Sequence, residues 1–346
     1  MTVPANVVEL CNLIEDTTDE AALVQTARGA RRIVTEAQRD GMPATKLAES
    51  WSTLVRSTVA SAARFGIPPS SAGWSWYVSG STARNEALPG SDVESILVLD
   101  DPRADLRAAM DSAGYVHSVL DRCGLRGDDK GAVASRARFC RTAVQWTEGI
   151  DAWTNDPQLD RGVVMAGLLA DARSVTGDSD ALRHSLAEVI KTRERALAAM
   201  LSDSLFVRAA LPSRLRLFAT RDDVVDLKAA AIEPVVSIAR WAALSSGSPT
   251  LATLDRLRDA SGTKFLSTDD AQVLRECYTI STRMRWHHRA RLWLDAGPND
   301  SRVTDEVTLS DLPPQDRALL RGVGREISGI RRKLAYLAST STFTGR

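Results

Sequence analysis

Apolar positions along residues 5–66 recur every three or four residues, which is the spacing of one face of an α-helix. The pattern breaks at 41–43, where glycine and proline stand close together, so we expect two or three helices before the proline-rich loop at 66–73. Short apolar runs of strand length replace the helical period at 74–79 and 93–99. These two runs predict a pair of strands.

Helical spacing returns after the second of these runs. It predicts a helix at 103–123, a polar loop at 124–131, and a further helix that carries an apolar stripe from Phe139 to Trp153. Residues 162–170 are an unbroken apolar run, which favours a strand buried on both faces of a sheet.

Strand patterns disappear after residue 180. The rest of the chain is predicted to be an all-helical bundle, with segments near 180–201, 203–210, 224–245, 250–260, 268–295 and after 314. We therefore expect an α+β fold, in which a small mixed sheet with flanking helices occupies residues 1–180 and a helical domain occupies residues 181–346.

Composition narrows the classes of partner. Lys and Arg together number 44, as do Asp and Glu, so the formal net charge is zero. A neutral chain argues against binding to nucleic acid or to an anionic membrane, although a local basic groove is still compatible with this composition. The four cysteines form no Cys-x-x-Cys pair, which is typical of free thiols in a reducing compartment. No run approaches the ~20 apolar residues of a membrane span, and the N-terminus lacks a signal-peptide pattern. We expect a soluble, cytoplasmic protein.

The second strand run opens with two carboxylates, Asp92 and Glu94. Side chains two apart in a strand lie on the same face, where two carboxylates repel each other unless a cation or a shared proton holds them. The turn Gly80-Ser81 ends the first strand run and offers backbone N–H groups and a hydroxyl to phosphate oxygens. Because Mg²⁺ prefers carboxylate and phosphate oxygens, these residues predict a magnesium site for a nucleotide. The alternative is a solvated strand end.

Two further charged residues follow the turn. Arg84 is predicted to neutralise charge on the nucleotide, and Glu86 is predicted to orient Arg84 through an ion pair. A purely structural ion pair is the alternative.

Charged residues of the 268–295 helix favour structural interpretations. His287 and His288 are adjacent and point in different directions on a helix, which argues against a metal site. The basic cluster on the same helix is expected to be a solvated face, with a nucleotide or acceptor site as the alternative; its members are Arg283, Arg285, Arg289 and Arg291.

The order Gly80-Ser81, a spacer of ten residues, then Asp92-Val93-Glu94 resembles the signature of the nucleotidyltransferase superfamily. Within it, the chain is most similar to a bacterial family of nucleotidyltransferases that carry a helical substrate-binding domain and are related to the PII-protein uridylyltransferases. The resemblance covers roughly residues 30–338. Further matching segments are Trp146, Trp153, Asp171-Ala-Arg173, Asp226-Leu-Lys228, Ile232-Glu-Pro-Val-Val and Met284-Arg285-Trp-His287.

The resemblance implies transfer of a nucleoside monophosphate from a nucleoside triphosphate to an acceptor, with loss of pyrophosphate. It implies Mg²⁺, with Mn²⁺ as an alternative, and an acceptor that is a small molecule or a protein. A third carboxylate completes the site in this superfamily. Asp171, after the apolar run at 162–170, is the candidate as metal ligand or general base, with a helix-capping role as the alternative. Lys228 is expected to reach nucleotide phosphates from the helical domain.

Glu94 departs from the family, which more often has Asp-x-Asp. Glutamate is one methylene longer, and the near-octahedral geometry that Mg²⁺ demands is sensitive to such a change. Two other functions therefore stay open. One is a nucleotide-binding regulatory protein without catalysis, and the other is an interaction module whose helical half binds a partner protein.

Overall fold

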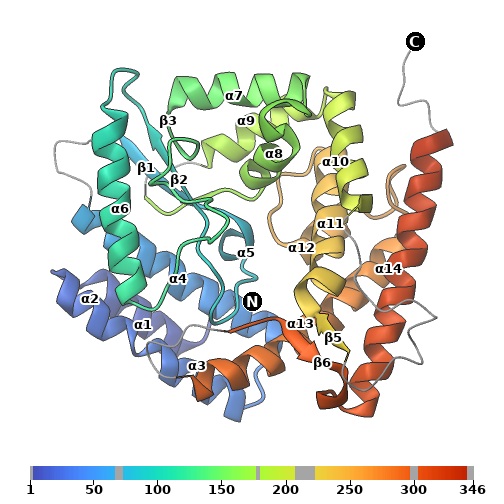
Figure 1. Cartoon of the computed structure of the whole chain (residues 1–346), viewed down its shortest axis with the longest axis horizontal. Helices are drawn as coiled ribbons and strands as arrows, with labels where there is room; N and C mark the ends of the chain where they lie inside the picture. The colour runs from blue at the N-terminus through green and yellow to red at the C-terminus, as the bar shows by residue number, and fades with distance from the viewer. Residues whose placement is uncertain (1–2, 67–72, 177–179, 207–222, 297–302, 341–346) are drawn as a thin grey trace. The chain divides into compact units, whose positions relative to one another are not determined.

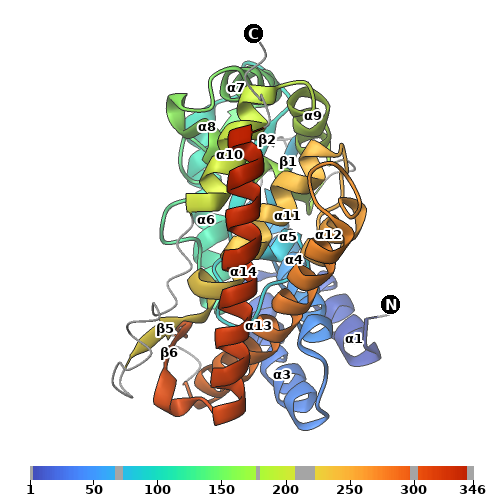
Figure 2. The same ribbon diagram turned by 90° about the vertical axis from the view of Figure 1, so that its right-hand side faces the viewer.

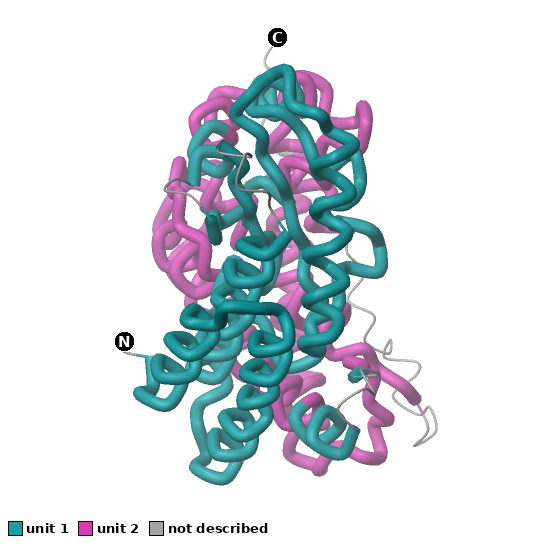
Figure 3. The backbone as a smooth tube through the Cα atoms, turned by 90° about the vertical axis from the view of Figure 1, so that its left-hand side faces the viewer, with its two compact units in different colours: residues 1–151, 168–185, 290–303 teal, residues 152–167, 186–289, 304–346 magenta. Residues whose placement is uncertain are grey.

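The structure of the chain is a computed structural model, which describes residues 3–66, 73–176, 180–206, 223–296 and 303–340. The chain divides into two compact units that interleave along the sequence (Figure 3). Unit 1 comprises Met1–Asp151, Leu168–Ser185 and Ala290–Val303, and unit 2 comprises Ala152–Gly167, Leu186–Arg289 and Thr304–Arg346.

The N-terminal part of unit 1 is helical, as its sequence pattern predicts. It forms four helices, where two or three are predicted: α1 (Ala5–Glu15), α2 (Glu20–Ala27), α3 (Ala30–Arg39) and α4 (Ala44–Gly66). The side chain of Asp19 accepts a hydrogen bond from the N–H of Ala22 at 2.9 Å and so begins α2 as a separate helix. Helix α4 contacts α1, α6 and the first strand of the sheet (Figure 1).

Unit 1 contains a four-stranded mixed sheet. Its strand order is β3-β2-β1-β4, and its strands are β1 (Trp74–Val78), β2 (Ser95–Leu99), β3 (Cys140–Thr142) and β4 (Arg173–Ser174). Strand β1 is antiparallel to both β2 and β4, whereas β2 and β3 are parallel and are joined through α6 (Leu106–Arg122). This sheet with its flanking helices confirms the predicted α+β class and the predicted pair of strands.

The apolar run at 162–170 is a helix, α8 (Gly162–Ala170), so the predicted strand is wrong. Periodicity alone cannot distinguish a short buried strand from a buried helix. The burial pattern has helical spacing, because Met165, Ala166 and Leu169 are buried whereas Val164 is exposed. The strand of this region is β4, which follows the run.

Two other segments contain strands inside regions predicted to be helical. Helix α7 (Ala143–Asn155) begins after β3, so the predicted helix from Phe139 is wrong over its first residues. In unit 2, β5 (Val224–Asp226) pairs antiparallel with β6 (Glu306–Thr308). The carboxylate of Asp226 accepts hydrogen bonds from the N–H groups of Lys228 and Ala229, so the helical turns start only after β5.

The rest of unit 2 is a helical bundle, as predicted, and Figure 2 shows α14 (Pro314–Thr340) alongside α10 (Glu194–Phe206). Ser267 caps the long helix α13 (Thr268–Asp295) by accepting a hydrogen bond from the N–H of Asp270. Further helical elements are the π-helical turn Lys228–Ile232, α11 (Glu233–Ser245), α12 (Thr253–Asp259) and α9 (Ala181–Ile190), which begins in unit 1. The predicted 203–210 helix extends beyond Phe206 into residues outside the described part of the chain.

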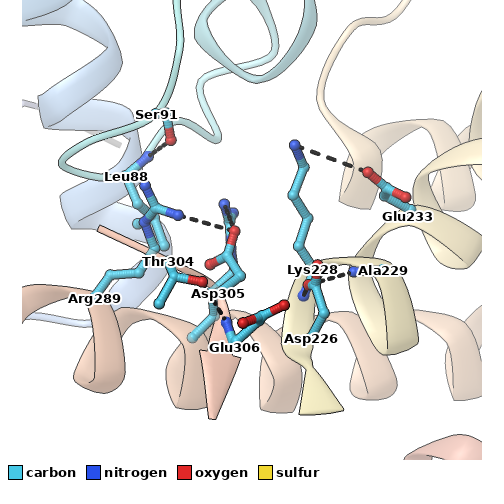
Figure 4. A network of polar contacts seen from close by, with 11 residues as sticks. Leu88, Ser91, Asp226, Lys228, Ala229, Glu233, Arg289, Thr304, Asp305 and Glu306 are labelled. Atoms are coloured by element: carbon cyan, nitrogen blue, oxygen red, sulfur yellow. Dashed lines mark hydrogen bonds and ion pairs between the residues drawn. The ribbon is translucent and has the colours of Figure 1, made fainter. Parts of the chain in front are cut away.

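The basic cluster of α13 is only partly the solvated face that its sequence predicts. Arg285 and Arg289 are buried in unit 2 and both donate to the carboxylate of Asp305, with Arg285 Nε at 2.7 Å and Arg289 Nη1 at 2.9 Å. Figure 4 shows the contact between Arg289 and Asp305. The two guanidinium groups hold the pKa of Asp305 well below its usual range, although burial alone would raise it. Arg283, by contrast, is half exposed.

Two expectations about composition concern the described residues. The four cysteines are free thiols, as expected, and burial raises the pKa of Cys140 to about 11. Among the helices of the described segments, none combines the length and the apolar character that crossing a bilayer requires.

Candidate active site

The turn that follows β1 places the first site residues in unit 1. Helix α5 (Gly80–Ala83) is a single turn that begins at Gly80. The φ of Gly80 is +61°, a backbone conformation that residues other than glycine rarely adopt. The backbone N–H of Ser79 donates to the carbonyl of Glu94 at 3.0 Å. This bond joins the end of β1 to the residue that precedes β2.

The carboxylate of Glu94 lies directly against the backbone of Gly80. A Cβ atom added to Gly80 would stand 2.2 Å from Glu94 Oε2 and 2.8 Å from Cδ. Such distances are far inside van der Waals contact, so any other residue at position 80 would displace this carboxylate. The sequence predicts that this turn offers hydrogen-bond donors to phosphate oxygens, which stays a prediction; in the structure the group beside Gly80 is the Glu94 side chain.

Asp92 lies beside the 124–131 loop, which local sequence patterns do not assign to the site. The N–H of Val93 donates to the carbonyl of Arg126 at 2.8 Å, and the N–H of Asp128 donates back to the carbonyl of Val93 at 3.2 Å. This pairing brings Asp92, Asp128 and Asp129 together, with one carboxylate oxygen from each within 4.8 Å of the others. The sequence signal for this group is the adjacent pair Asp128 and Asp129 between two glycines of the loop.

This set of donors fits a hard divalent cation. All of the contributing atoms are carboxylate oxygens, which Mg²⁺ and Mn²⁺ accept as ligands. The carboxylate of Glu94, which lies against Gly80, adds further oxygen donors close to the turn. The chain therefore supplies oxygen ligands on both sides of the Asp92-Val93-Glu94 segment.

Arg84 is the centre of a buried ion-pair group. Its Nε donates to Glu86 Oε2 at 2.7 Å and its Nη1 donates to Asp171 Oδ2. The side chains are 8 % exposed for Arg84, 10 % for Glu86 and 2 % for Asp171, so water screens these charges little. The predicted pairing of Arg84 with Glu86 is present, and Asp171 is a second carboxylate on the same guanidinium.

Asp171 follows a helix, α8, and not the strand that the sequence predicts at 162–170. It follows α8 and precedes β4, and β4 pairs with β1 beside the turn. The hydroxyl of Ser79 donates to the carbonyl of Leu168 at 2.7 Å, which fixes the end of α8 against the start of the turn. The three predicted carboxylates thus have different neighbours: Gly80 for Glu94, the 128–129 loop for Asp92, and Arg84 for Asp171.

His117 on α6 contacts Ser95, the first residue of β2. Its Nε2 and the hydroxyl oxygen of Ser95 share a hydrogen bond of 2.7 Å, and the same oxygen accepts from the N–H of Ala134 at 2.9 Å. Its Nδ1 is buried and has no hydrogen-bond partner among the described residues, and it lies against Gly127 of the acidic loop. Burial lowers the pKa of His117 to about 4.

Acid is expected to destabilise the chain through His117. Because its pKa is about 4 when folded and about 6.5 when unfolded, the unfolded state binds the proton first, and stability falls as the pH drops from about 6.5 to 4. The contribution is about 3 kcal/mol at most. His117→Gln removes this titration, so urea unfolding at pH 7, 5.5 and 4.5 should show a shallower loss in the variant. Parallel loss in both proteins would contradict this assignment.

Lys228, the remaining predicted site residue, belongs to unit 2. Its N–H is held by the carboxylate of Asp226 at 2.8 Å, and its ammonium group lies 3.8 Å from Glu233 Oε1 (Figure 4). The Lys228 side chain is 48 % exposed, so this ion pair is a weak one. Its predicted contact with nucleotide phosphates stays a prediction.

Comparison with known protein families gives two matches. Residues 28–160 match the family described as "Putative nucleotidyltransferase DUF294", and residues 194–337 match the "Putative nucleotidyltransferase substrate binding domain". The first match includes the turn at Gly80 and the Asp92-Val93-Glu94 segment, and the second lies within the helical half of the chain. No curated protein matches the chain.

Proposed function

Because the chain belongs to the family of putative nucleotidyltransferases, we propose that it moves a nucleoside monophosphate group from a nucleoside triphosphate to an acceptor and releases pyrophosphate. The observation that carries this proposal is the carboxylate of Glu94 packed against Gly80, at the turn where β1 ends. The close contact places an acidic side chain beside the first N–H groups of a helical turn, which have no acceptor inside their own helix.

A divalent cation, Mg²⁺ or Mn²⁺, is part of the proposal. Asp92 and Glu94 would hold it, and Asp128 and Asp129 are within reach of Asp92. When bound, such an ion neutralises phosphate charge during in-line displacement at phosphorus. The turn at Gly80 and Ser81 would bind the phosphate oxygens through backbone N–H groups and the Ser81 hydroxyl.

The roles of the other predicted residues follow from their contacts. Arg84 is held by Glu86 and Asp171 in one orientation, which supports a fixed positive charge facing the nucleotide. Asp171 was expected as metal ligand or general base, and its pairing with Arg84 favours a positioning role. Lys228 is proposed to contact nucleotide phosphates. The acceptor, a small molecule or a protein, is assigned to the substrate-binding domain at 194–337, on the strength of that domain's description.

A catalytically impaired regulatory protein is the second candidate. It is motivated by glutamate at position 94, whose longer side chain changes the reach of one metal ligand. This protein would bind a triphosphate and be stabilised by it without releasing pyrophosphate.

The test supplies each labelled nucleoside triphosphate with Mg²⁺ or Mn²⁺ and a cell extract as the source of acceptor. We expect label transfer and pyrophosphate release, both strongly reduced by Asp92→Asn and unchanged by Asp111→Asn, an exposed carboxylate on α6. Nucleotide-induced stabilisation without turnover would favour the regulatory candidate. Neither binding nor turnover with any nucleotide would refute both and leave the interaction module.

A further inference from the structure

The guanidinium groups of Arg56, Arg84 and Arg173 lie near the turn that begins at Gly80, and they differ in whether a described carboxylate neutralises their charge. Arg84 has two carboxylate partners. Arg56 on α4 and Arg173 in β4 instead meet at one neutral atom, Oδ1 of Asn85, to which they donate at 2.7 Å and 3.1 Å. The two donating nitrogens are therefore no farther apart than the sum of these distances.

Asn85 is suited to this meeting point. Its backbone has φ +63°, which asparagine tolerates better than most residues. The residue follows Arg84, the C-cap of α5, so its side-chain oxygen binds both arginines near the end of the helical turn opposite to Gly80. A four-residue helical turn rises by about 6 Å, so the two ends of α5 are close together.

The other hydrogen bonds of Arg56 also go to neutral groups. They are to the carbonyl of Thr82 at 2.9 Å and the hydroxyl of Thr53 at 3.1 Å. Arg173 makes no further hydrogen bond within the described segments, so most of its five N–H donors are unused.

No described carboxylate pairs with either guanidinium. Asp180 attracts Arg173 electrostatically, but its carboxylate is already bound by Arg183 and by the N–H of Ser174. Glu49 is the weakest of the charges acting on Arg56.

The two arginines carry an electrostatic cost in this arrangement. Burial, followed by repulsion from Arg173, lowers the pKa of Arg56 to about 10. Burial likewise lowers the pKa of Arg173. A pair of partly desolvated cations that share one neutral acceptor is stabilised by any anion that reaches both.

We propose that Arg56 and Arg173, held together by Asn85, form an anion subsite that takes a phosphate group. A phosphate presents several oxygens, which match the unused donors of a guanidinium fork. The phosphate belongs either to the polyphosphate chain of the nucleotide, an assignment that rests on the proposed function, or to a separate phosphorylated molecule. The subsite itself depends on neither.

The experiment measures binding of sodium pyrophosphate to the full chain by calorimetry without metal, and then binding of each nucleoside triphosphate. Arg173→Gln is the test variant, because Arg173 makes a single hydrogen bond within the described segments. Arg64→Gln is the matched control, since Arg64 is an exposed arginine on the same helix as Arg56. We expect pyrophosphate affinity at least about tenfold weaker in Arg173→Gln and unchanged in Arg64→Gln.

The nucleotide arm identifies the source of the phosphate. A parallel loss of triphosphate affinity in Arg173→Gln assigns the subsite to the nucleotide, and unchanged triphosphate affinity assigns it to another molecule. Equal pyrophosphate affinity in wild type and Arg173→Gln, or no pyrophosphate binding by the wild type, overturns the subsite. If Arg173→Gln proves unstable, Arg173→Lys, which keeps the charge without the fork, must still bind more weakly than wild type.

The two proposals fail separately. Loss of pyrophosphate binding in Arg173→Gln, together with no transfer by the wild type, keeps the subsite and removes the transferase. Transfer by the wild type, together with unaltered pyrophosphate binding in Arg173→Gln, keeps the transferase and removes the subsite.

Discussion

Gly80→Ala is expected to abolish nucleotidyl transfer while leaving most of the fold intact. The added Cβ would stand 2.2 Å from Glu94 Oε2, so the carboxylate must swing away from the turn. The carboxylate is the end of a flexible side chain and can move at little cost to packing, but it then leaves the position proposed for a metal ligand. Transfer, or metal-dependent stabilisation by a nucleotide, measures the loss.

A second glycine separates this contact from backbone strain. Gly41 has φ +63°, nearly the same as Gly80, but a Cβ added there would meet no atom within 4 Å. Both alanine variants should therefore lose about 1–2 kcal/mol of unfolding free energy from the left-handed backbone. Only Gly80→Ala should lose transfer.

Shortening the opposing side chain should restore part of the activity. Aspartate is one methylene shorter than glutamate, so Glu94→Asp withdraws the carboxylate from the space that the new methyl group occupies. Gly80→Ala combined with Glu94→Asp is expected to be more active than Gly80→Ala alone. Wild-type transfer by Gly80→Ala would contradict the role given to this contact.

Much of this site was predictable because its parts are local in sequence. The strand, turn and strand from Trp74 to Leu99 follow from apolar runs and a Gly-Ser turn, and the Arg84 to Glu86 pair joins residues two apart. Such features depend on interactions that short-range pattern rules describe well.

The missing parts depend on contacts between distant residues. Asp128 and Asp129 reach Asp92 only because the loop hydrogen-bonds to Val93, and Asp171 pairs with Arg84 across 87 positions of sequence. The sequence of helix α8 predicts a strand because an unbroken apolar run carries no period. Local patterns hold no information on which loop or helix end closes onto a turn.

Arg84→Met is expected to lower the unfolding free energy by about 3–5 kcal/mol at pH 7, the usual cost of removing one partner of a buried ion pair. The change removes the guanidinium that contacts the carboxylates of Asp171 and Glu86, which are 2 % and 10 % exposed. Urea unfolding measures the loss.

Two comparisons isolate the buried charge. Arg122→Met removes a guanidinium from the exposed pair with Glu20, whose side chains are 46 % and 32 % exposed, and should cost at most about 1 kcal/mol. Adding Asp171→Leu to Arg84→Met removes the more deeply buried of the two carboxylates that contact Arg84 and should recover part of the lost stability. A loss in Arg84→Met no larger than in Arg122→Met would mean that water reaches the Arg84 group and that its charges are not held in a fixed orientation.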